Sequence, residues 1–136
     1  MNAGPFSPEL AFALHAAREA AELAESVRLK QGSGSFIKLD RSPVTVADFA
    51  IQALIAARLE KQFPADRLVA EEDSADLLKH AHQSLWRQVQ DIVRRCLPEA
   101  GEKDILSWIE LGGAEAKGRY WVLDPIDGTK GFLKGA

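Results

Sequence analysis

The sequence has little of several features that define specialised classes of protein. It contains a single cysteine, Cys96, so no disulfide can form within the chain. Charged residues interrupt even the alanine-rich start, so no run approaches the roughly 18 apolar residues that a membrane-spanning helix needs. Positive charge is not in excess, because 17 Lys and Arg stand against 20 Asp and Glu, a formal net charge of −3. We therefore expect no disulfide framework, no membrane contact and no broad nucleic-acid-binding surface.

What is present is the ordinary composition of a globular domain. The 136 residues are 46% hydrophobic and 27% charged, which fits one folded unit. The first residues show neither a secretory signal nor an Arg-rich transit peptide, so a cytoplasmic location is the default expectation. Cys96 continues the helical apolar pattern of the residues before it, which favours a buried thiol over a nucleophile.

The spacing of apolar residues predicts helices and two short strands. A helix is expected to begin at Ser7-Pro8 and to end near Gly32. Its buried face would consist of Leu10, Leu14, Ala17, Ala21 and Ala24. A second helix, capped by Thr45, ends before Pro64 and buries one stripe, formed by Ile51, Leu54, Ile55 and Leu59. Further helices are expected over 84–97 and 104–111, and buried strands over 68–70 and 120–123.

Acidic residues follow both predicted strands directly. Glu71 and Glu72 come after the first strand, and Asp124 and Asp127 after the second. Open α/β sheets gather ligand-binding groups at the carboxyl ends of their strands, so these carboxylates can converge. Carboxylates held that close repel one another unless one takes up a proton or a hard cation lies between them. An all-oxygen ligand set without nearby His or Cys favours Mg²⁺ or Mn²⁺ over Zn²⁺.

The segment from Asp124 to Thr129 has two interpretations. Because Pro125 stiffens the turn, both aspartates and the carbonyl of Ile126 can face one centre. Gly128 permits close approach of a ligand, and Thr129 adds a hydroxyl and an amide that can meet a phosphate. The alternative is a plain Asp-Pro and Asp-Gly turn between two elements.

Asp48 taken by itself favours a structural interpretation. It completes the pattern of a capping box with Thr45, in which an acid at the third helical position stabilises the helix alone.

Three motifs in this order carry a family resemblance: residues 45–48 (TVAD), 70–74 (AEEDS) and 121–132 (WVLDPIDGTKGF). Together they resemble the lithium-sensitive, magnesium-dependent phosphatases of the inositol monophosphatase superfamily. Within it the chain is most similar to the 3′(2′),5′-bisphosphate nucleotidases of plants and fungi. That similarity lies in residues 42–48 (SPVTVAD), in the GTKGF ending and in the long stretch between the second and third motifs.

The resemblance implies an α+β fold, a layered α/β sandwich of the sugar-phosphatase type. Residues 1–136 would be its N-terminal, metal-binding portion, without the C-terminal subdomain. The implied Mg²⁺ ligands are Glu71, Asp124, Asp127 and the carbonyl of Ile126. Asp48 and Thr129 would position and activate the attacking water, Glu72 would support them, and Gly128 and Thr129 would bind the substrate phosphate.

The implied activity is hydrolysis of a small-molecule phosphate ester, with neither nucleic acid nor membrane as a partner. The substrate would be adenosine 3′,5′-bisphosphate or its sulfated form, which lose the 3′-phosphate in sulfate metabolism. Family members extend well beyond the Gly-Thr motif and supply a further Asp ligand there, so we expect the 136-residue chain to be an inactive fragment on its own. The alternatives are an inositol monophosphatase or inositol polyphosphate 1-phosphatase, and a non-catalytic remnant or binding module.

Overall fold

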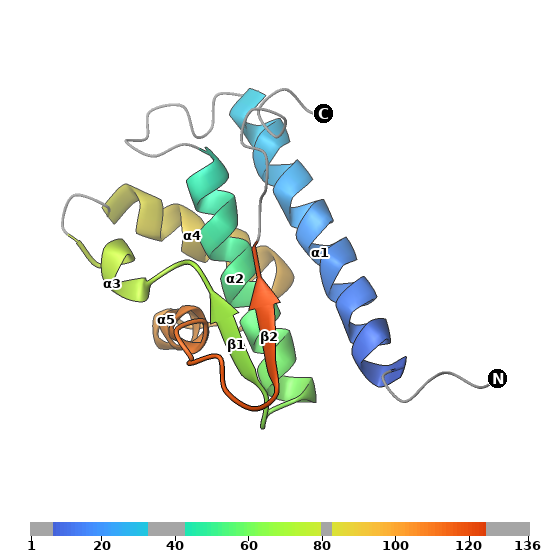
Figure 1. Cartoon of the computed structure of the whole chain (residues 1–136). Coiled ribbons are helices and arrows are strands. Elements are labelled where there is room, and N and C mark those ends of the chain that lie inside the picture. Colours follow the sequence, from blue (N-terminus) through green and yellow to red (C-terminus); the bar gives the residue numbers. More distant parts are fainter. Residues whose placement is uncertain (1–6, 33–42, 80–82, 125–136) are drawn as a thin grey trace.

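The computed structural model describes residues 7–32, 43–79 and 83–124 of the chain (Figure 1). It combines helices with a small parallel sheet, in agreement with the expected α+β class. The elements in chain order are α1 (Ser7–Gly32), α2 (Pro43–Gln62), β1 (Arg67–Ala70), α3 (Ser74–Leu77), α4 (Gln83–Cys96), α5 (Glu102–Leu111) and β2 (Tyr120–Leu123).

The two strands pair in parallel, with Arg67 opposite Tyr120 and Ala70 opposite Leu123. A parallel pair needs a long crossover connection, and here the crossover contains α3, α4 and α5. The chain returns to the sheet through an isolated antiparallel bridge between Val69 and Gly113. Both strands therefore run in the same direction and end at the same edge of the sheet (Figure 1).

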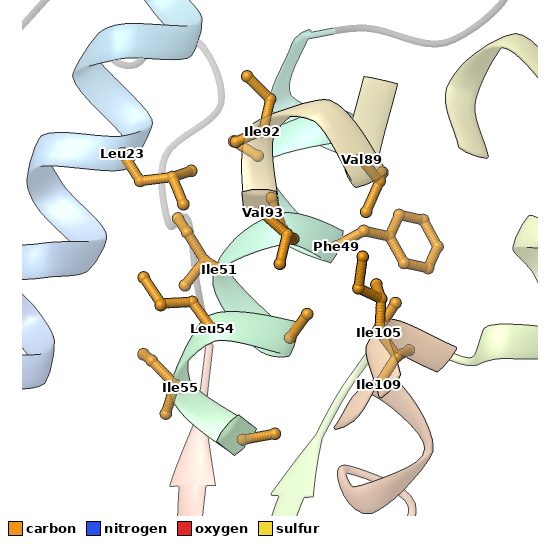
Figure 2. Packing of buried hydrophobic residues seen from close by; sticks show 14 of the residues in the cluster. Leu23, Phe49, Ile51, Leu54, Ile55, Val89, Ile92, Val93, Ile105 and Ile109 are labelled. Carbon is orange, nitrogen blue, oxygen red and sulfur yellow. The ribbon is translucent and has the colours of Figure 1, made fainter. Parts of the chain in front are cut away.

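Helix α2 is the centre of the hydrophobic core. It packs against α1 on one side and against α4 and α5 on the other, and Figure 2 shows Ile51 and Leu54 facing Leu23 while Phe49 faces Val89 and Ile105. Almost every residue between Val46 and Ala56 is buried. The predicted stripe is buried as expected, comprising Ile51, Leu54, Ile55 and Leu59. Burial also extends around the rest of the helix, because a helix covered on several sides has no solvated face to keep polar.

The buried face of α1 also differs from the prediction. Leu10 and Leu14 are 60% and 64% exposed, whereas Phe12 and Ala16 are 6% exposed. Phe12 packs edge-on against Phe63 and Trp121, with ring centroids 5.5 and 5.2 Å away. The alanine-rich helix offers more than one apolar stripe, and the stripe that carries the aromatic ring faces the protein because it buries more surface.

Strand β2 is only half buried, in contrast to the predicted buried strand. Trp121 and Leu123 pack against the core, while Tyr120 is 43% and Val122 73% exposed. The Trp121 indole N–H donates to Oδ2 of Asp66 at 2.9 Å. The strand thus alternates, as one with a single covered face does.

The later helices match the prediction, and the short α3 was missed. Leu85, Val89, Ile92 and Val93 of α4 are buried, as are Ile105 and Ile109 of α5. Cys96 is a half-buried free thiol, and burial raises its pKa, which is unfavourable for a nucleophile. Among the described residues, every helix is too short or too polar to cross a membrane.

Candidate functional site

The parallel pairing of β1 and β2 brings two acidic residues to one edge of the sheet. Because Ala70 pairs with Leu123, the next residues along the two strands, Glu71 and Asp124, leave the sheet side by side. Glu72 follows Glu71 and is half-buried, whereas Glu71 and Asp124 are exposed. The sheet register therefore places carboxylates from distant parts of the sequence next to each other.

Asp48 faces these acids from the N-terminal part of α2. This helix runs opposite to β1, so its first turns lie at the carboxyl ends of both strands (Figure 1). The pKa of Asp48 is raised from 3.8 to about 7. Burial is the largest cause, and the negative charges of Glu72, Glu71 and Asp124 contribute the rest. A carboxyl group in this position is costly to ionise without a compensating positive charge.

One oxygen of the Asp48 carboxylate, Oδ1, is buried and has no hydrogen bond within the described part of the chain to offset the loss of water. Buried polar atoms almost always have a partner, so an orphaned carboxylate oxygen points to a missing donor, water or cation.

The capping-box interpretation of Asp48 is wrong. Helix α2 begins at Pro43, so Thr45 lies inside its first turn instead of preceding it. Proline suits a first helical position because its fixed φ is helical and its missing N–H would have no partner there. Asp48 then lies more than a turn beyond the start, too far along to act on the helix terminus.

The segment after β1 is held in place by three side chains to which the sequence analysis gave no role: Gln52, Asp73 and Ser74. The Gln52 carboxamide, buried in α2, bonds to both the N–H and the C=O of Glu72. Asp73 caps α3 through a 2.9 Å bond from the N–H of Ala75 to its Oδ1. The Ser74 hydroxyl donates to Oε1 of Glu110 at 2.9 Å. The available signal for Gln52 was an amide in an otherwise apolar helical stretch, four residues after Asp48.

Four of the predicted site residues lie outside the described residues: Ile126, Asp127, Gly128 and Thr129. Within the described ranges, no group of three His, Cys, Asp or Glu side chains is arranged as a metal site by itself. The described part does show Glu71, Glu72 and Asp124 within electrostatic reach of Asp48.

The donor chemistry of these acids, as distinct from their arrangement in the described ranges, suits a hard divalent cation. They supply carboxylate oxygens only, which are the ligands of Mg²⁺ and Mn²⁺. The Oδ1 atom of Asp48 is buried without a partner among the described residues, and the negative charges of Glu72, Glu71 and Asp124 lie near it, a combination that a nearby cation would compensate.

Comparison with known proteins adds a family and its relatives. The family described as "Inositol monophosphatase family" matches residues 7–136. The chain is 39% identical over 147 residues to the 3'(2'),5'-bisphosphate nucleotidase of Schizosaccharomyces pombe, covering 96% of this chain and 41% of the relative. It is 40% identical over 146 residues to the enzyme of the same name from Oryza sativa, covering 96% and 40%. A third relative, 3'(2'),5'-bisphosphate nucleotidase 1 of Candida albicans, is 36% identical over 148 residues, covering 96% and 40%. The chain thus spans about two fifths of the length of these curated relatives.

Proposed function

Because the chain belongs to the inositol monophosphatase family, we propose that it forms the N-terminal, metal-binding part of a magnesium-dependent 3′(2′),5′-bisphosphate nucleotidase with a layered α/β sandwich fold. The observation that carries this proposal is the group of carboxylates at the sheet edge, Asp48, Glu71, Glu72 and Asp124. The printed names of the relatives support the choice of substrate class within the family.

The proposed Mg²⁺ ligands are Glu71 and Asp124, together with Asp127 and the Ile126 carbonyl from the segment that follows β2. When bound, the divalent ion stabilises negative charge on phosphoryl oxygens and lowers the pKa of water. The parallel register favours this ligand set because it presents Glu71 and Asp124 from adjacent strand ends.

The proposed reaction is an in-line displacement at phosphorus. Asp48 and Thr129 orient the attacking water, and Glu72 supports them from beside Glu71. The amides and hydroxyl of Gly128 and Thr129 hold the phosphate oxygens. The water oxygen bonds to phosphorus, the bond from phosphorus to the ribose 3′-oxygen breaks, and that oxygen leaves with a proton as a hydroxyl. The products are AMP, or adenosine 5′-phosphosulfate from the sulfated substrate, and inorganic phosphate.

A chimera tests the proposal directly. Residues 7–136 replace the matching segment of the Schizosaccharomyces pombe nucleotidase, and phosphate release from adenosine 3′,5′-bisphosphate is measured with Mg²⁺. We expect turnover that Asp127→Asn abolishes, while Asp91→Asn, an exposed carboxylate on α4, leaves it unchanged. A folded chimera without turnover would refute the proposal. Faster release from inositol 1-phosphate than from the nucleotide would instead favour an inositol phosphatase.

The isolated chain provides a second assay. We expect it to release little phosphate from the same substrate, because the whole enzymes in the comparison are more than twice as long. Robust turnover by the 136 residues alone would show that the segment is a complete catalyst.

A further inference from the structure

The most unusual polar group in the core is the side chain of Gln52. Helix α2 is otherwise apolar around it, and Gln52 is fully buried with 0% exposure. Burying an amide is unfavourable unless its hydrogen-bonding atoms are paired. The Gln52 carboxamide therefore needs groups that accept from it and donate to it.

Both ends of the Gln52 carboxamide bond to the backbone of Glu72. Its Oε1 accepts from the N–H of Glu72 at 3.0 Å, and its Nε2 donates to the C=O of the same residue at 2.9 Å. This two-way pairing is what a neighbouring strand provides to one residue in an antiparallel ladder. Strand β1 ends at Ala70, so Glu72 lies beyond the sheet. The Gln52 side chain gives its backbone the two hydrogen bonds that a neighbouring strand would give.

The second Nε2 hydrogen connects the same amide to α5. It donates to the C=O of Ile109 at 2.9 Å, near the C-terminus of that helix. Gln52 therefore fastens the backbone at Glu72 to two helices at once.

Gly112 leaves the space for this arrangement. A Cβ atom at Gly112 would lie 2.5 Å from Nε2 of Gln52 and 2.9 Å from Cβ of Ala70, both closer than real contacts. The backbone of Gly112 is right-handed, with φ −70°, so an alanine there would suffer from the contact and not from its backbone conformation. The C=O of Gly112 also accepts from the N–H of Ala70 at 2.8 Å. The end of β1, α5 and the Gln52 amide are thus packed without spare room.

We propose that Gln52 is a positioning residue for the metal site, and this inference rests on the proposed function. Gln52 lies one helical turn after Asp48, so the two side chains project from the same face of α2. The Asp48 carboxylate interacts electrostatically with Glu71 and Glu72. The Gln52 carboxamide holds the backbone of Glu72 by hydrogen bonds. The distance between the Asp48 carboxylate and the acids after β1 is thereby set by a single rigid helix.

The test compares metal affinity in variants matched for their effect on folding. Gln52→Met keeps the size of the side chain and removes its bonds to Glu72 and Ile109. Gln90→Met makes the same change at another buried glutamine, 6% exposed on α4. Binding of Mn²⁺ to the 136-residue chain is followed by electron paramagnetic resonance, and urea unfolding is measured without metal. We expect Gln52→Met to weaken Mn²⁺ binding by ~10–100-fold, as loss of groups that orient metal ligands typically does, and Gln90→Met to bind as the unaltered chain does.

A second pair of variants keeps the proposal falsifiable if Gln52→Met does not fold. Gly112→Ala displaces the carboxamide, whereas in Gly113→Ala the new Cβ meets only the Glu110 carbonyl at 3.3 Å. We expect Gly112→Ala to weaken Mn²⁺ binding by about tenfold or more, and Gly113→Ala to leave it near that of the unaltered chain.

The outcomes separate this inference from the proposed function. If the unaltered chain does not bind Mn²⁺, the proposed metal site and the role of Gln52 both fail. If the unaltered chain binds Mn²⁺ and the folded Gln52→Met and Gly112→Ala variants bind it equally well, the positioning role alone is overturned. An equal loss of affinity in Gln90→Met would also overturn it, because the effect would then follow from core stability.

Discussion

Asp48→Asn should stabilise the metal-free chain, and only at high pH. Asparagine has nearly the shape of aspartate but carries no charge, so it removes the cost of an ionised group among Glu72, Glu71 and Asp124. The residue that the proposed reaction requires is thus one that the fold alone would do better without.

The sign and size of the effect follow from the raised pKa of Asp48. The folded protein holds the Asp48 proton more tightly than the unfolded chain does, so the contribution to stability is full below the unfolded pKa of 3.8 and is lost as the pH rises through about 7. A pKa difference of about 3 corresponds to about 4 kcal/mol if fully expressed. Asp48 is only partly buried, so screening by water reduces the expected value to about 2 kcal/mol.

The assay is urea unfolding with EDTA at about pH 4.5 and about pH 8. The free energy of unfolding of Asp48→Asn minus that of the unaltered chain should increase by about 1.5 kcal/mol between the two pH values, because about pH 4.5 lies above the unfolded pKa of 3.8 and part of the effect is already present there. Asp91→Asn, on the exposed surface of α4, is the control and should show no comparable increase. The same stability difference at both pH values would refute the argument that Asp48 is destabilised by ionisation.

Three further predictions concern the site and the packing around it. Saturating Mn²⁺ should raise the melting temperature of the unaltered chain, and Glu71→Gln should remove most of that rise because it deletes a charged ligand; an unchanged rise would exclude Glu71 as a ligand. Phe12→Ala should cost about 3 kcal/mol and Leu14→Ala less than about 1 kcal/mol, because only Phe12 is buried; equal losses in urea unfolding would contradict the observed orientation of α1. Ser74→Ala should cost about 1 kcal/mol, because it removes the bond to Glu110; an unchanged urea midpoint would show that this bond contributes nothing.

The candidate site was easier to predict from the sequence than the packing that supports it. Glu71 and Asp124 could be placed together because each directly follows a short apolar strand, and the carboxyl ends of parallel strands share one edge. That rule needs only local sequence and the direction of pairing. It does not give the surroundings of Asp48, which depend on how α2 lies against the sheet.

The helix faces were harder to predict for a physical reason. In α1 both the stripe through Leu14 and the stripe through Phe12 are apolar, and the choice depends on the partners Phe63 and Trp121 from distant parts of the chain. Gln52 was missed for a related reason, since its role is defined by the backbone of Glu72 and by Ile109, far away in the sequence. Periodicity describes one element at a time, so it cannot reveal contacts of this kind.

The parallel pairing of β1 with β2 has a consequence for the order of folding events. The chain between the two strands has to close as a loop before they can pair, and such non-local contacts form slowly because the entropy of the loop is lost first. We therefore expect Glu71 and Asp124 to come together late, after α1, α2, α4 and α5 have packed. Recovery of divalent-ion binding in a refolding experiment would accordingly report one of the last steps, after most helical signal has returned.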